Sequence, residues 1–173
     1  MWPLTSTLPD TCFILAPRAP KLMGPGQFSW HEITPQWPGL NIYQRLSDEL
    51  ISRVHIFAHE NNLRLNDIDV IGFSQGAVMA YALTILYPEL IGKAAALAGF
   101  LPQNWMHDLA LTNLHNRQFF ISHGIKDDIV PVNKAHQTAQ WLREHGAEVL
   151  FCESNTGHKI NNDCLKKMGK FFH

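Results

Sequence analysis

The stretch Ile68-Asp-Val-Ile-Gly-Phe-Ser-Gln-Gly76 joins a short apolar run to a Gly-x-Ser-x-Gly sequence. The run Ile68–Phe73 is typical of a buried strand in a parallel sheet. Residues Ala77–Leu86 predict a helix, which Pro88 ends. A strand, a tight turn that carries a serine, and a helix together form the setting that a nucleophilic serine requires.

Ser74 is therefore the candidate nucleophile, and we expect strained backbone at this residue. Gly72 and Gly76 would keep side chains away from the point where strand and helix approach each other. The backbone N–H of Gln75 would stand at the helix N-terminus, where it could stabilise an oxyanion. The alternative is a glycine-rich turn in which the serine only caps the helix, so the decision depends on partners elsewhere in the chain.

The composition predicts one globular domain over residues 1–173. Hydrophobic residues make up 46% and charged residues 17% of the chain, which argues against disorder. The net charge of -1 favours neither nucleic acid nor an acidic membrane as a partner. No apolar run approaches the length of a membrane span, and residues Met1–Ser6 lack the pattern of a signal peptide.

Cys12, Cys152 and Cys164 are odd in number and lack the spacing of a metal site. They favour reduced cysteines and a cytoplasmic location. His55 and His59 lie one turn apart on a predicted helix, but no third ligand accompanies them. We therefore expect no metal.

Strand-like and helix-like segments alternate along the chain, which predicts an α/β fold with a mainly parallel sheet. With Ile68–Phe73 there are about five strands, and the helices would form two further layers. The other predicted strands are Thr11–Ala16, Ala94–Ala98, Arg117–Ser122 and Glu148–Cys152, and the other helices are Leu40–Asn61, Val132–His145 and Ile160–Phe172.

The segment Pro17–Gly39 is rich in proline and predicts a long loop that contains Trp30 and Trp37. Long ordered loops are usually functional, so we expect it to form one wall of a pocket. The alternative is a surface loop whose aromatic side chains cover the edge of the core.

A nucleophilic serine needs a base to take its proton and an acid to orient that base. Asp127 and Asp128 follow one predicted strand, and His158 follows the last one. In parallel sheets such groups meet at the carboxyl ends of the strands. The order Ser74, Asp127 or Asp128, His158 is the chain order of the α/β-hydrolase triad.

With these residues in view, the chain resembles the bacterial carboxylesterase/phospholipase family of α/β-hydrolases, which includes the acyl-protein thioesterases. The resemblance runs from about Trp2 to the end. It rests on Ala16-Pro17-Arg18-Ala19-Pro20, Ser29-Trp30-His31-Glu32, Gly72-Phe73-Ser74-Gln75-Gly76, Gly99-Phe100-Leu101-Pro102, the loop His123–Pro131, and Gly157-His158-Lys159.

The resemblance implies Ser74 as nucleophile, Asp127 rather than Asp128 as orienting acid, and His158 as general base. It also implies that Trp30 and Phe100 line an acyl pocket. His123 would serve as a hydrogen-bonding strut at the end of its strand.

The family's pattern also includes an upstream strand and a His-Gly-x-Gly loop that donates a second oxyanion N–H, and no such stretch stands in this sequence. We therefore expect an N-terminally truncated α/β-hydrolase sheet with a gap beside Ile68–Phe73. Direct pairing of Thr11–Ala16 with Ile68–Phe73, another segment in the gap, or association of two copies into a homodimer would close it. Loss of one donor lowers the rate by roughly 10²–10³.

The sequence thus predicts a serine hydrolase of small to medium ester or thioester substrates that works through an acyl-enzyme without a cofactor. The competing hypothesis is a weakened or inactive α/β-hydrolase-like binding protein. A dienelactone-hydrolase-type enzyme is a further alternative, against which Ser rather than Cys at position 74 counts.

Overall fold

The computed structural model describes residues 2–65 and 68–173. In this part of the chain the centre is a four-stranded parallel sheet in the order β3-β4-β5-β6. The strands span Ile68–Phe73, Ile91–Leu97, Gln118–Gly124 and Glu148–Ser154. Neighbours in sequence are neighbours in space, so each connection crosses over one face of the sheet. The carboxyl ends of all four strands therefore lie along the same edge.

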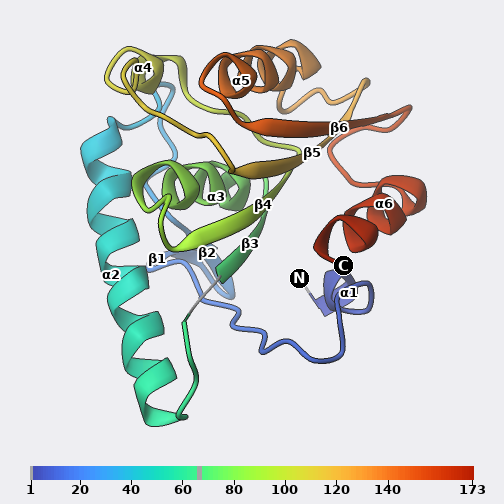
Figure 1. Cartoon of the computed structure of the whole chain (residues 1–173). Helices are drawn as coiled ribbons and strands as arrows, with labels where there is room; N and C mark the ends of the chain where they lie inside the picture. The colour runs from blue at the N-terminus through green and yellow to red at the C-terminus, as the bar shows by residue number, and fades with distance from the viewer. Residues whose placement is uncertain (1, 66–67) are drawn as a thin grey trace.

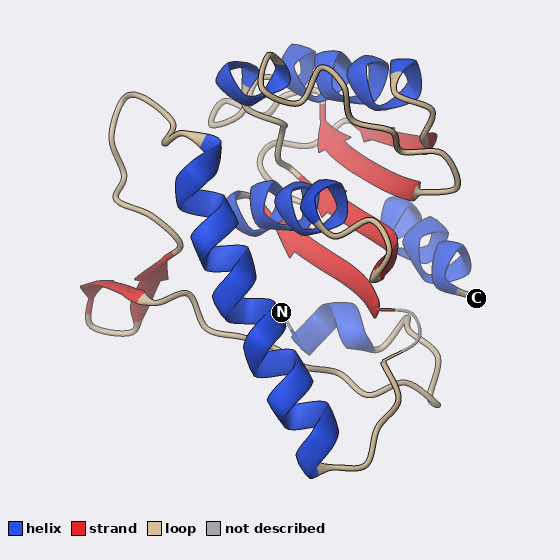
Figure 2. Ribbon diagram, turned by 60° about the vertical axis from the view of Figure 1, so that its left-hand side comes forward, coloured by secondary structure: helices blue, strands red, loops and turns tan. Residues whose placement is uncertain are grey.

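Helices cover both faces of the sheet and make three layers (Figures 1 and 2). Ala94 and Ala96 of β4 belong to the core that the sheet forms with α2 (Leu40–Glu60), α3 (Gln75–Leu86) and α5 (Val132–Glu144). The alternate residues Ala95 and Leu97 lie in a second core with α6 (Asn162–Phe172). Side chains of a strand alternate between faces, so one short apolar run serves both cores.

The N-terminal residues lie against the C-terminal helix. Helix α1 (Trp2–Thr5) contributes Leu4 to the core beneath α6, and a Cβ atom on Gly169 would lie only 2.7 Å from the Thr7 carbonyl oxygen. Figure 1 shows α1 and α6 side by side.

The α/β sandwich with a parallel sheet is confirmed, but the predicted strand Thr11–Ala16 is wrong. This segment is irregular and exposed, and Phe13 keeps 71% of its surface in solvent. An apolar run becomes a strand only where a neighbouring strand takes its backbone hydrogen bonds, and none of the described strands pairs with it. Direct pairing with β3 is wrong for the same reason, and β3 is an edge strand of four rather than one of about five.

The predicted loop Pro17–Gly39 contains a hairpin that the sequence did not reveal. Strands β1 (Lys21–Gly24) and β2 (Gln27–Ser29) pair antiparallel around Gly26, whose φ is 72°. After the hairpin, Trp30 and Trp37 pack against the main core. The short helix α4 (Gln103–Met106) was also missed, since a single turn leaves no periodic pattern to read.

The expectation of reduced cysteines is wrong for two of the three. Cys152 of β6 forms a disulfide with Cys164 of α6, whereas Cys12 is free and exposed. Both bonded residues are buried, and the bond closes a ring around the segment between strand and helix. The sequence spacing could not show this, because the approach of α6 to β6 is a tertiary contact.

His55 and His59, the two histidines one turn apart, are exposed on helix α2. Within the described residues no group of three His, Cys, Asp or Glu side chains is arranged to hold a metal ion. The helices described also include none that is long and apolar enough to cross a membrane.

Candidate active site

Ser74 lies at the turn between β3 and α3 with φ 55° and ψ -116°. This is a left-handed backbone conformation in a residue other than glycine, which costs about 1–3 kcal/mol and persists only where the surroundings enforce it. The Ser74 N–H donates to the Leu97 carbonyl at 2.8 Å, and the Ser74 carbonyl accepts from the Ala77 N–H at 2.9 Å. These bonds fix the turn to β4 and to the first turn of α3.

The close approach of strand and helix depends on Gly72 more than on Gly76. A Cβ atom at Gly72 would lie 1.9 Å from the Gly76 carbonyl oxygen, whereas a Cβ atom at Gly76 would meet no atom within 4 Å. Gly99, after β4, is equally confined, because its Cβ would lie 2.4 Å from that of Ala77. Both glycines were expected to keep side chains away from the approach of strand and helix. The structure requires a glycine for this reason at Gly72 but not at Gly76.

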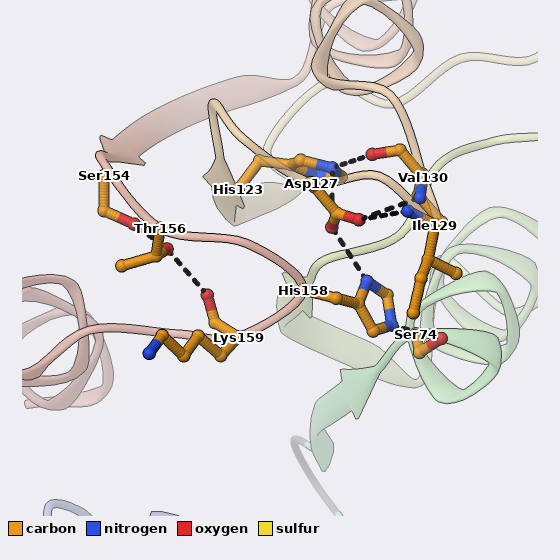
Figure 3. Close-up of polar contacts among 9 residues, drawn as sticks. All are labelled: Ser74, His123, Asp127, Ile129, Val130, Ser154, Thr156, His158 and Lys159. Carbon is orange, nitrogen blue, oxygen red and sulfur yellow. Dashed lines mark hydrogen bonds and ion pairs between the residues drawn. The ribbon is translucent and has the colours of Figure 1, made fainter.

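Three side chains from three loops meet at the carboxyl edge of the sheet (Figure 3). Nε2 of His158 lies 2.9 Å from Oγ of Ser74, and Nδ1 of His158 lies 2.8 Å from Oδ2 of Asp127. The carboxylate accepts the Nδ1–H, so Nε2 presents a lone pair to the serine hydroxyl. The structure therefore brings together all three residues that the sequence proposed as a triad.

Asp127 is held as a buried carboxylate. Its side chain has no exposed surface, and Oδ1 accepts from the N–H groups of Val130 at 2.8 Å and Ile129 at 3.0 Å. Burial alone would raise the pKa of Asp127, but hydrogen bonds from Val130, His158 and Ile129 together outweigh it and lower the pKa below its usual value. The group is thus an anion suited to orienting His158.

The geometry also distinguishes the two aspartates and locates His123. Asp128 is exposed, and the bond to His158 comes from Asp127. His123 is fully buried, with Nε2 at 2.8 Å from the Val130 carbonyl oxygen and 3.4 Å from Oδ2 of Asp127. It therefore supports the loop that carries Asp127, as a strut would.

The acid is the buried member of the triad, and the other two residues are partly exposed. The side chain of Asp127 is fully buried, that of His158 is 15% exposed, and Ser74 is half-buried. The ring of Phe73 contacts that of His158 with centroids 5.0 Å apart and keeps it in place. A substrate can therefore reach the serine, while water is kept from the bond between His158 and Asp127.

Gln75 is the first residue of α3, and the first N–H groups of an α-helix have no partner within the helix. Its backbone N–H therefore has the position expected of an oxyanion donor. The Trp30 N–H, a neighbouring backbone donor, is engaged with the Gln75 side chain at 2.8 Å. This engaged group is not free to act as the second oxyanion donor.

Of the two predicted pocket residues, Phe100 belongs to an aromatic group with Trp37 and His31, and Trp30 is next to His31 in the chain. Trp30 is half-buried, whereas Phe100 is only 6% exposed, beneath the Lys134 ammonium, which lies 4.5 Å from its ring centroid. Trp37 contacts Phe100 at 5.0 Å between centroids and His31 at 4.8 Å. Trp37 and His31 were not singled out from the sequence as site residues, because only tertiary contacts bring them here.

A depression of about 450 Å³ lies elsewhere, lined by segments 110–113 and 143–146 together with His115. These segments precede β5 and β6, so it is at the opposite edge of the sheet from Ser74. It does not contribute to the candidate site.

The chain is similar in sequence and in fold to several known proteins. A family model described as phospholipase/carboxylesterase matches residues 13–173. A carboxylesterase of Bacillus cereus has the same fold, with a TM-score of 0.82, 20% identity, and coverage of 98% of this chain and 79% of that one.

Two plant relatives are similar in sequence. A probable carboxylesterase, SOBER1-like, of Arabidopsis thaliana is 29% identical over 58% of this chain, and the chain spans 39% of that protein. A protein of Oryza sativa subsp. japonica named as a probable inactive carboxylesterase is 24% identical over 99% of this chain and 76% of its own length.

Proposed function

Because the chain belongs to the phospholipase/carboxylesterase family, we propose that it is a serine hydrolase of carboxylic ester or thioester bonds. The observation that carries this proposal is the continuous hydrogen-bonded path from Ser74 through His158 to Asp127. The substrates are small molecules with small to medium acyl groups.

The reaction follows from the atoms in place. Ser74 Oγ attacks the carbonyl carbon while His158 Nε2 takes its proton, and Asp127 stabilises the imidazolium that forms. The Gln75 N–H stabilises the oxyanion. His158 then protonates the leaving alcohol or thiol, and an acyl-enzyme remains on Ser74. Water, deprotonated by His158, releases the acid and restores the serine.

A second candidate function is a weakened or inactive binding protein. It is favoured by the engagement of the Trp30 N–H with the Gln75 side chain, which takes this backbone donor out of use. A similar rice protein is named as a probable inactive carboxylesterase. Removal of one oxyanion donor lowers kcat by about 10²–10³, so a measurable activity distinguishes the two candidates.

We expect a fluorophosphonate probe to label Ser74 and no other serine. Only a serine that shares its proton with a histidine is nucleophilic near neutral pH. Mass spectrometry of the labelled chain identifies the site, and hydrolysis of p-nitrophenyl acetate measures turnover. The Ser74→Ala variant is the control and should lose both signals. Labelling of another serine, or none on folded protein, would contradict the proposed triad.

We expect Trp30→Ala to raise KM more for longer acyl chains than for acetyl esters. The Trp30 side chain is half-buried, and its backbone N–H is bonded to the side chain of Gln75, the residue after Ser74. We expect the indole to offer apolar surface to the acyl chain, where each buried methylene contributes about 0.8 kcal/mol. A series of p-nitrophenyl esters measures this. Phe100→Ala tests a different property, because truncation of so buried a ring costs about 3–5 kcal/mol of stability. An unchanged chain-length profile in Trp30→Ala would remove Trp30 from the pocket.

A further inference from the structure

The side chain of Gln75 makes contacts that the proposed role of its backbone N–H does not require. Oε1 lies 2.8 Å from the Trp30 nitrogen and 2.9 Å from Ser29 Oγ, and Nε2 lies 3.1 Å from Nε2 of His31. One carboxamide thus holds three consecutive residues that are distant in sequence. The residue next to the nucleophile therefore binds the segment that follows the β1–β2 hairpin.

The Trp30 N–H fixes the orientation of this carboxamide, because a backbone N–H can only donate. A half-turn of the amide would place its own N–H groups against that donor. With Oε1 toward Trp30, Nε2 donates to the lone pair on Nε2 of His31. The proton of His31 is then on Nδ1, which donates to the Glu32 carbonyl at 2.7 Å. Both nitrogens of this buried ring are satisfied.

Ser29 adds a variable contact to the same group. Its hydroxyl lies near both the His31 carbonyl oxygen, at 2.5 Å, and Oε1 of Gln75, at 2.9 Å. The single hydroxyl proton can be donated to only one of them at a time. The bond from the Trp30 N–H is therefore the constant one of the two that Oε1 accepts.

Because Gln75 holds His31, it also restrains the aromatic rings that His31 contacts directly or through a neighbour. The His31 ring contacts Trp37, and Trp37 contacts the buried Phe100. Beyond Trp37, the Pro38 carbonyl accepts from Nε1 of Trp105 at 2.9 Å, which anchors the far end of the segment to the core. The hairpin before Ser29 is exposed and provides little support. At its near end, the segment is thus held to the nucleophile's helix by Gln75.

We propose that the Gln75 side chain is a positioning residue that sets acyl-chain selectivity. It fixes Trp30 directly, and Trp37 through His31, relative to Ser74. The residue then serves twice: its backbone N–H faces the oxyanion, and its carboxamide sets the wall that receives the acyl chain. This inference rests on the proposed hydrolase function and names the part of the chain that determines its substrate range.

The decisive variant is Gln75→Met, which keeps the side-chain length and the backbone N–H but removes all three hydrogen bonds. We expect the ratio of kcat/KM for p-nitrophenyl octanoate to that for the acetate to fall about tenfold, mainly through KM, the size expected for loss of roughly one net hydrogen bond. If Gln75 had a purely structural role, the variant would lower kcat/KM for both esters by the same factor.

Two further variants control the experiment. Gln75→Glu keeps the two contacts that Oε1 accepts but loses the donation to Nε2 of His31, so its octanoate-to-acetate ratio should fall less than that of Gln75→Met. A carboxylate near the oxyanion lowers the hydrolysis rate of both esters. Gln140→Met changes an exposed helical glutamine that bonds Glu144 and should leave both rates unchanged.

Amide hydrogen exchange gives a readout that does not depend on turnover. Peptides covering residues 29–37 should exchange about tenfold faster in Gln75→Met than in the wild type or in Gln140→Met, since local protection follows the bonds that are lost. An unchanged octanoate-to-acetate ratio of kcat/KM in Gln75→Met would overturn the role in selectivity. Unchanged hydrogen exchange in residues 29–37 would show that the Gln75 side chain does not hold this segment. A wild-type protein that neither hydrolyses esters nor labels at Ser74 overturns the proposed function, while exchange still decides whether Gln75 holds the segment.

Discussion

Asp127→Asn should lower kcat for a short ester about 10⁴-fold, whereas Asp128→Asn should leave it within about twofold. An amide in place of the orienting carboxylate favours the wrong tautomer of the catalytic histidine, which is the origin of such losses. Oδ2 of Asp127 is the atom that meets Nδ1 of His158, while Asp128 is exposed. Steady-state kinetics of the two variants with p-nitrophenyl acetate measures the difference.

Asp127→Asn should also change how the free energy of unfolding depends on pH. The folded pKa of Asp127 is lowered, so its carboxylate stabilises the fold above the pKa of the unfolded chain, about 3.9. That contribution is lost as the pH falls through the still lower folded pKa. The difference in unfolding free energy between the wild type and Asp127→Asn should therefore shrink in this acidic range. Equal kinetic losses in both variants, or a larger one in Asp128→Asn, would reverse the assignment.

Gly72→Ala should destabilise the chain by more than about 3 kcal/mol, above the usual range for overpacking. The added methyl would lie 1.9 Å from the Gly76 carbonyl oxygen and 2.6 Å from the Ala77 nitrogen, and both atoms are backbone. Because a helix backbone cannot rotate out of the way as a side chain can, α3 as a whole would have to move from β3. A fall in melting temperature and loss of Ser74 labelling should occur together.

Gly76→Ala is the matched control for that experiment. It adds the same methyl group at the other glycine of the motif, where no atom lies within 4 Å. Alanine is favoured over glycine in a helix by up to about 1 kcal/mol, so the melting temperature should be unchanged or higher. If both variants unfold alike, the close approach at Gly72 does not limit the fold.

The strands and helices that the sequence predicted well are those with a strong pattern of their own. Ile68–Phe73 was predicted at its observed bounds, and the helix at Leu40–Asn61 ends one residue earlier than expected. Thr11–Ala16 has an equally apolar pattern, but none of the described strands pairs with it, so it stays irregular. A periodic pattern shows that a segment can form a strand, whereas pairing decides whether it does.

The candidate triad could be predicted because each of its residues follows a strand, and parallel strands bring such positions together. The choice of Asp127 came from the family resemblance, and its contact with His158 agrees with that choice. The Gln75 carboxamide and its three partners could not be predicted. Those contacts join residues of a proline-rich segment to α3, and no spacing within either segment records them.

The bond between Cys152 and Cys164 makes the segment that carries His158 part of a covalently closed ring. Lys159 lies within this ring and is exposed, so trypsin can cut the chain directly after it. The two fragments of a chain nicked there would still be joined through sulfur, and helix α6 would remain tethered to β6. Such a nick would go unnoticed on a non-reducing gel and would appear only when a thiol separates the C-terminal fragment from the rest.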